Sequence, residues 1–159
     1  MHKTVAWLIL ALALITAGCD KARVFEENIN LPDNNWYVEN TPVFAFQIQD
    51  TTQTYNIYLN VRYQLSYEFY NLYLRHQLLG PDEKELSAAL HELTLMDAKT
   101  GKPLGKGSSN IYDIQALALK NVRFKKVGTY KLKLTQYMRR DPLTNIMAVG
   151  VRVAKQEEK

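Results

Sequence analysis

The segment from Tyr55 to Leu65 alternates between two sets of side chains, and this pattern constrains the fold more than any other feature of the chain. One set is mostly polar, and the other is apolar or aromatic: Asn56, Tyr58, Asn60, Arg62 and Gln64 against Tyr55, Ile57, Leu59, Val61, Tyr63 and Leu65. Successive side chains of a β-strand point to opposite faces of a sheet. The segment is therefore predicted to be a strand with one face against a core and one face toward solvent.

The same period of two recurs in other segments of the chain. Their apolar sets are Phe44, Phe46 and Ile48; Tyr70, Leu72, Leu74 and Leu78; Tyr130, Leu132, Leu134 and Met138; and Met147, Val149, Val151 and Val153. Residues 111–119 fit either a strand or a helix. Sheets with one dry face are typical of antiparallel sandwiches. We therefore predict an all-β fold, an antiparallel β-sandwich of about 8 strands, over residues 35–155.

One short helix is expected between these strands. Gly80-Pro81-Asp82 should end a strand, and Asp82 followed by Glu85 has the spacing of a helix capping box. The helix would run to about Leu90. Glu83, Glu85 and Glu92 would flank it on solvated faces, rather than form a pair of catalytic carboxylates.

Residues 1–18 have the organisation of a cleaved secretory signal peptide. Lys3 precedes a charge-free run of 13 residues from Val5 to Ala17, which is shorter than the about 20 residues that span a membrane. Small residues then precede Cys19, as in a bacterial lipobox, although Thr16 stands where Leu is usual. We expect cleavage before Cys19 and a diacylglyceryl group on its thiol, which would anchor the protein to a lipid bilayer.

The cysteine count is compatible with this anchor. Cys19 is the only cysteine, so a disulfide cannot form within the chain. Residues 19–34 are polar and are predicted to be a lipid-anchored tether, and residues 156–159 are a polar tail. The expected location is the cell envelope, membrane-bound on the periplasmic side or at the cell surface, with inner and outer membrane both open.

Patterns typical of catalysis, metal binding or cofactor binding are not found in the sequence. His76 lies among the apolar positions of a predicted strand, where a histidine with satisfied hydrogen bonds is expected, and His91 falls at the end of the predicted helix. The segment 101–108 is rich in glycine and lysine, but Gly107 stands where a phosphate-binding loop needs Ser or Thr after the lysine. We therefore predict a protein that is not an enzyme and has no cofactor and no metal.

Charge is distributed unevenly along the chain. Residues 19–119 hold 8 Lys and Arg against 13 Asp and Glu, whereas residues 120–159 hold 11 against 3. A basic C-terminal part can contact anionic lipid, polysaccharide or an acidic partner, or can simply form solvated strand faces. Nucleic acid is not expected as a partner of an exported lipoprotein.

Tyrosine and arginine side chains gather on the predicted wet faces. Protein interfaces favour both residues, sugars stack on tyrosine, and cross-strand pairs of these side chains also stabilise sheets. A sugar-binding version of this surface would use Trp36, Tyr58 and Tyr73 as stacking platforms. The whole candidate interaction surface comprises Trp36, Tyr58, Arg62, Tyr67, Asn71, Tyr73, Arg75 and Arg139.

Taken in chain order, a set of short motifs resembles the gliding-motility lipoprotein family of the GldH type, as a divergent member. The motifs are the lipobox Cys19; Trp36 ahead of Pro42 and Phe44-x-Phe46; Tyr55-x-Ile57-x-Leu59-x-Val61-Arg62; Tyr67-Glu68-Phe69-Tyr70-Asn71-Leu72-Tyr73; Gly101-x-x-Leu104-Gly105-x-Gly107 with Ile111-Tyr112-Asp113; Gly128-x-Tyr130; Gln136-Tyr137-Met138-Arg139; and Leu143-x-x-Ile146-x-x-Val149-Gly150-Val151-Arg152.

This resemblance implies a non-enzymatic envelope lipoprotein. It would be an accessory or assembly component of the gliding machinery of Bacteroidetes-type bacteria, which is linked to type IX secretion. Its partners would be the lipid bilayer and other gliding or secretion proteins of the envelope. The alternative from the residues themselves is a carbohydrate-binding lipoprotein of the cell envelope, with polysaccharide as its partner.

Overall fold

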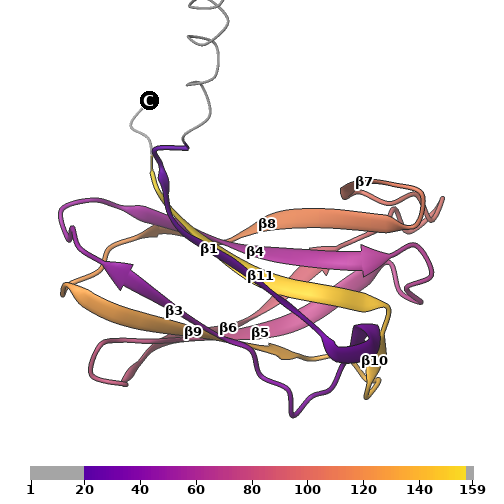
Figure 1. Cartoon of the computed structure of the whole chain (residues 1–159), viewed down its shortest axis with the longest axis horizontal. Helices are drawn as coiled ribbons and strands as arrows, with labels where there is room; N and C mark the ends of the chain where they lie inside the picture. Colours follow the sequence, from indigo (N-terminus) through magenta and orange to yellow (C-terminus); the bar gives the residue numbers. More distant parts are fainter. Residues whose placement is uncertain (1–19, 157–159) are drawn as a thin grey trace, which may run out of the picture.

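The computed structural model describes residues 20–156, which form a sandwich of two antiparallel sheets (Figure 1). The first sheet has the strand order β1-β11-β4-β8-β7, the second has the order β3-β9-β5-β6, and β10 pairs with β2. The strands are β1 (Arg23–Asn30), β2 (Asn35–Trp36), β3 (Val43–Ile48), β4 (Tyr55–Gln64), β5 (Asn71–Leu79), β6 (Glu85–Thr94), β7 (Lys106–Ser108), β8 (Ile111–Val122), β9 (Gly128–Gln136), β10 (Leu143–Thr144) and β11 (Ile146–Lys155).

The predicted all-β antiparallel class is confirmed. Within the described range there are eleven strands, more than the eight or so expected, and residues 111–119 belong to strand β8. The one helical element there is a short 3-10 turn, η2 (Pro32–Asn34). None of the helices in residues 20–156 is long and apolar enough to cross a membrane.

The core lies between the two sheets and is built from the period-two sets. In β4, every second residue from Tyr55 to Tyr63 is at most 1% exposed. An aromatic group closes one end of the core, where Phe124 lies 4.5 Å from Tyr130, 5.4 Å from Tyr55 and 6.0 Å from Phe46, measured between ring centroids. Burying each such side chain contributes about 1.5–3 kcal/mol to folding.

Three residues assigned to the core face lie elsewhere. Leu65 is 40% exposed because β4 ends at Gln64 and the chain turns there, and Tyr70 is 48% exposed because it precedes β5. Met147 is only half-buried, since a β-bulge between Ile146 and Ala148 breaks the alternation. Ile146, fully buried, takes the core position instead.

The predicted helix after Asp82 is wrong. Strand β6 occupies this place and pairs antiparallel with β5, from Leu79 opposite Glu85 to Asn71 opposite Thr94. The turn before it is closed by the Gly80 N–H, which donates to the Lys84 carbonyl at 2.9 Å. The edge of β5 offers backbone partners to the whole segment, and this tertiary pairing overrides the helix propensity of its Ala, Leu and Glu residues.

The predicted tether is wrong over residues 23–30. This segment is strand β1, which pairs antiparallel with β11 in a register that places Arg23 opposite Ala154. The folded domain therefore begins four residues after Cys19. The signal peptide and Cys19 itself lie outside the described residues.

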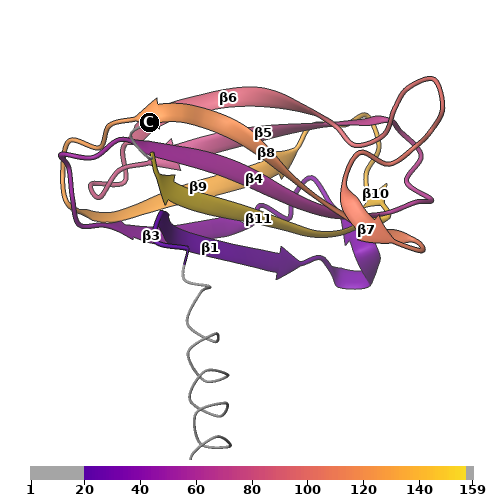
Figure 2. The same cartoon turned by 90° about the horizontal axis from the view of Figure 1, so that it is seen from above.

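The two sheets are stacked so that their edge strands lie along two long sides of the molecule (Figure 2). Strands β1 and β3 run along one side, which we call the β1–β3 flank. Strands β6 and β8 run along the other, the β6–β8 flank, and there only the short β7 lies beyond β8 in the first sheet.

Candidate functional site

Three residues of the predicted interaction surface are buried, which corrects that prediction. Trp36 is 0%, Tyr67 4% and Asn71 8% exposed. The Trp36 indole donates to the Asn40 carbonyl at 2.9 Å, and the Tyr67 hydroxyl donates to the Asn71 carbonyl at 3.0 Å. These side chains fix the loops at the ends of the strands. Their burial was missed because Tyr67 lies in a loop and Trp36 and Asn71 lie at strand ends, where alternation does not indicate burial.

The exposed members of the predicted surface do not form one patch. Tyr58 and Arg62 lie on the outer side of β4, whereas Tyr73 and Arg75 lie on the outer side of β5 in the other sheet. Arg139 follows the end of β9 and is exposed. Trp36, Tyr58 and Tyr73 therefore do not form a joint stacking platform for a sugar, because the first is buried and the other two are on opposite faces.

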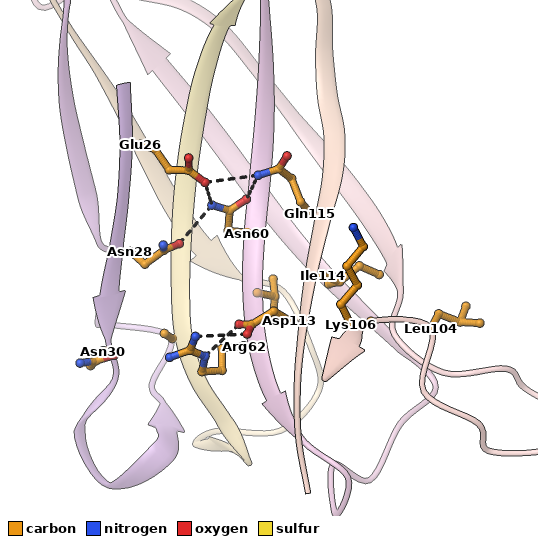
Figure 3. A pocket seen from close by; sticks show the side chains of 13 residues that line it. Glu26, Asn28, Asn30, Asn60, Arg62, Leu104, Lys106, Asp113, Ile114 and Gln115 are labelled. Atoms are coloured by element: carbon orange, nitrogen blue, oxygen red, sulfur yellow. Dashed lines mark hydrogen bonds and ion pairs between the residues drawn. The ribbon is translucent and has the colours of Figure 1, made fainter. Parts of the chain in front are cut away.

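The outer face of the first sheet carries a polar groove of about 620 Å³ (Figure 3). The Asn60 amide donates at 3.1 Å to both Glu26 and Asn28, and the Gln115 amide donates to the Asn60 oxygen at 2.8 Å. These contacts join β1, β4 and β8 over the intervening strand β11. They leave few hydrogen-bonding groups of the four side chains for a ligand.

An ion pair continues this polar face toward β7. Arg62 donates two hydrogen bonds to Asp113, at 2.8 and 3.1 Å, and the carboxylate raises the pKa of the guanidinium. Both side chains are about half exposed, so the pair is worth at most about 1 kcal/mol. We interpret this face as a cross-strand ladder that stabilises the sheet.

The outer face of β5 and β6 has a different character. Leu86 and Leu90 of β6 are 54% and 50% exposed, and Arg75 of β5 is paired directly with Leu90. Tyr73 lies on the same side of β5, and its carbonyl accepts a hydrogen bond from the N–H of Tyr137, which is 62% exposed. Leucine, tyrosine and arginine side chains that project together are typical of protein contact surfaces. We call these five residues the β5–β6 surface.

Strand β6 is also the last strand of its sheet within residues 20–156. An edge strand presents backbone N–H and C=O groups that no neighbouring strand satisfies. Natural edges are usually protected by charge, proline or a bulge. β6 has one bulge at its start and the charged Glu85 and Glu92 near its ends, but its middle, from Leu86 to Leu90, has no charged side chain. The edge is therefore suited to accept a strand from another chain.

A buried histidine of β5, His76, lies beside the edge strand β6. His76 is 1% exposed, and its Nδ1 lies 2.7 Å from Nε2 of His91 while its Nε2 lies 3.1 Å from the Ser87 hydroxyl. Both ring nitrogens have partners, as expected for this position. Burial first, and the neighbouring His91 second, lower the pKa of His76 to about 4, and burial also lowers the pKa of His91. His91 lies on strand β6, not at the end of a helix.

Ser87, His76 and His91 are thus connected in the order of a nucleophile, its base and a group that orients the base. A pKa of about 4 makes His76 a weak base at neutral pH, because efficient bases have a pKa near the working pH. Residues 20–156 hold no group of three or more His, Cys, Asp or Glu side chains that could bind a metal ion. The cluster is better explained as a hydrogen-bonded link between β5 and β6.

Comparison with known proteins gives one family. The family model described as GldH lipoprotein matches residues 23–153. The chain is 26% identical to a gliding motility lipoprotein GldH homolog of Christiangramia forsetii, over 95% of both chains. It is 28% identical to the gliding motility lipoprotein GldH of Flavobacterium johnsoniae, over 94% of this chain and 96% of that protein.

Among solved structures, the chain is similar to the VP2 subviral particle of infectious bursal disease virus. The identity is 12%, and the match covers 85% of this chain and 33% of that one with a TM-score of 0.38. A likeness this low does not bear on function.

Proposed function

Because the chain belongs to the GldH lipoprotein family, we propose that it is a lipid-anchored, non-enzymatic component of the gliding machinery of its cell, linked to type IX secretion. The observation that carries this proposal is the family match over residues 23–153, together with two relatives named gliding motility lipoproteins that align over nearly their whole length.

Cys19 is the proposed anchor. Each CH₂ group of an attached acyl chain contributes about 0.8 kcal/mol when buried in a bilayer, so two or more chains give stable attachment. Strand β1 begins at Arg23, so little chain separates the lipid from the folded domain. The domain would then lie close to the membrane surface within the cell envelope.

Contact with envelope proteins is proposed to occur at the β5–β6 surface and the adjoining edge of β6. Leu86 and Leu90 supply apolar area, Arg75 and Tyr73 supply hydrogen bonds beside it, and the edge backbone supplies donors and acceptors. Strand addition combines these features, since the backbone gives affinity and the side chains give specificity. The polar face with Arg62 and Asp113 lacks this combination.

Complementation tests the proposal. A gliding strain that lacks its own GldH relative receives the wild-type chain or a Leu86→Lys/Leu90→Lys variant. A third strain receives a control variant in which lysine replaces two exposed valines elsewhere, Val43→Lys/Val127→Lys. We expect wild type and control to restore colony spreading and the β6 variant to fail. Equal spreading of the two variants would contradict the proposed surface, and failure of the wild type would contradict the proposed role.

The anchor has its own test. Cys19→Ala should leave the protein out of the membrane fraction or with an uncleaved signal peptide, and spreading should be lost. A Cys19→Ala protein that is cleaved and still membrane-bound would contradict lipid anchoring.

A further inference from the structure

A second, basic groove lies at the end of the first sheet where the chain enters and leaves the domain. It measures about 910 Å³, and its lining includes Lys120 at the end of β8, Arg123 beyond it and Lys155 at the end of β11. All three cations are exposed. Asp20 and Arg152 form its rim on the side of β1.

Within the described range, Lys120, Arg123 and Lys155 make no ion pair with another residue. Arg152, by contrast, makes two ion pairs. Arg152 binds Asp20 and Glu26, and this contact lowers the pKa of the Asp20 carboxyl. Hydrogen bonds from Thr52 chiefly lower the pKa of Asp50, and Lys155 adds to this shift from beyond ion-pair distance. Lys120, Arg123 and Lys155 thus leave a concentrated positive charge in the groove.

The groove is directly adjacent to the proposed anchor. Asp20, which lines the groove, directly follows Cys19 in the chain. Asp20 is held in place, because its carboxylate accepts from Ala22 N–H at 3.2 Å and pairs with Arg152, while its carbonyl accepts from Arg23 N–H at 3.2 Å. A lipid on Cys19 would therefore bring the membrane surface to the rim of the groove.

We propose that Lys120, Arg123 and Lys155 bind the phosphate groups of anionic lipid headgroups and thereby orient the anchored domain with this end toward the bilayer. The inference rests on the proposed lipid at Cys19. Lys and Arg side chains near an anionic surface each strengthen membrane binding about fivefold, and phosphate is matched by both ammonium and guanidinium groups. The lipid gives attachment and the groove gives orientation.

The test uses the full-length lipidated protein reconstituted in vesicles. A Gln53→Cys substitution introduces a labelling site beside the groove, since the native cysteine would carry lipid. Energy transfer from a dye at this site to a labelled lipid reports how closely this end of the domain approaches the membrane. Vesicles of phosphatidylcholine alone are compared with vesicles that contain phosphatidylglycerol.

The groove variant is Lys120→Gln/Arg123→Gln/Lys155→Gln. A control with the same loss of charge is Lys99→Gln/Lys102→Gln/Lys106→Gln, whose exposed lysines lie near β7, at the other end of β8. We expect transfer to rise on anionic vesicles for wild type and control, and the groove variant to lose that rise. No rise for wild type, or an equal loss in both variants, would overturn the inference.

Failure of the proposed anchor is distinguishable from failure of the groove. A protein without lipid would not stay in phosphatidylcholine vesicles at all, which would overturn the anchor and this inference with it. A protein that stays in both kinds of vesicle without a change in transfer would overturn the groove alone.

Discussion

The two long flanks of the sandwich differ in how the gap between the sheets is filled. On the β1–β3 flank, Phe25 packs against Phe46 with ring centroids 5.9 Å apart, and Phe46 stacks on Tyr130 at 6.1 Å. On the β6–β8 flank, the inward positions mix small side chains, such as the exposed Ala89 and the half-buried Ala116, with larger ones that pack on the core: Leu93, Tyr112 and Ile114. Sheets pack about 10 Å apart, so the alanine positions leave this flank less fully packed than the β1–β3 flank.

The edge strands differ in the same sense. β1 carries Arg23, Glu26 and Glu27 along its edge, which is the charged protection expected of a strand that should not pair with another chain. β6 has Glu85 and Glu92 near its ends but exposes Leu86 and Leu90 between them. The β1–β3 flank is the more tightly packed one, and the proposed contact edge lies on the other. Substitutions on the two flanks should therefore change different properties.

The largest effect on stability is expected for Phe46→Ala. This change should destabilise the fold by about 3–5 kcal/mol, because it removes a buried aromatic side chain from the β1–β3 flank. Leu90→Ala, on the β6–β8 flank, should change the free energy of unfolding by at most about 0.5 kcal/mol. Urea unfolding of both variants measures the difference. Similar losses for the two would mean that the flanks do not differ as described.

The next effect is the pH dependence of stability, which is expected to come from His76 beside the β6–β8 flank. The pKa of His76 is about 4 in the folded chain, against 6.5 as its ordinary value. The unfolded chain binds the proton more readily, so stability should fall as pH decreases from about 6.5 to 4, by up to about 3 kcal/mol. His76→Leu should remove most of this dependence. Equal pH profiles for variant and wild type, measured by urea unfolding, would contradict the assignment.

A smaller loss is expected for Gly150→Ala on the closed side. A Cβ at this position would collide with the Asn28 side chain and lie 2.5 Å from the Glu27 carbonyl oxygen. Overpacking of this kind costs about 1–3 kcal/mol. Adding Asn28→Ala to Gly150→Ala should recover only part of the lost urea midpoint, because the contact with the Glu27 carbonyl remains. Full recovery of the wild-type midpoint would show that the β1 backbone does not approach β11 this closely.

The smallest effect is expected for Arg62→Gln on the polar outer face. Its ion pair with Asp113 is half exposed, and such pairs contribute about 1 kcal/mol or less. Unfolding in low and high salt should show that the difference from wild type shrinks as salt rises. A loss well above this value would give the polar face a larger part in stability than its exposure allows.

The sequence predicted those parts of the fold in which one face is dry. The alternation from Tyr55 to Tyr63 identified β4 because both neighbouring strands and the second sheet enforce a single register. β1 and β6 were missed because their side chains do not alternate between buried and exposed, unlike those of β3, which is also an edge strand. Their backbone pairing, to β11 and β5, is invisible in a local pattern.

The candidate surface was predicted only in part, for a related reason. Tyr73 and Arg75 were placed on a wet face correctly, because β5 alternates regularly. Leu86 and Leu90 were assigned to a helix, so their exposure beside Arg75 had no sequence signal. Trp36 and Tyr67 were taken as exposed because they lie at strand ends, where burial depends on how the chain closes over the core.

The most direct test of the β5–β6 surface as a contact surface is photo-crosslinking in gliding cells. A photoreactive amino acid replaces Leu90 on β6 or, as the matched control, Val43 on β3, which are 50% and 43% exposed. We predict a crosslink to an envelope protein from position 90 that is absent from position 43 and disappears when Leu86→Lys is added. A crosslink of equal yield from position 43, or none from position 90 in cells that glide, would contradict the proposal that the β5–β6 surface is the contact surface.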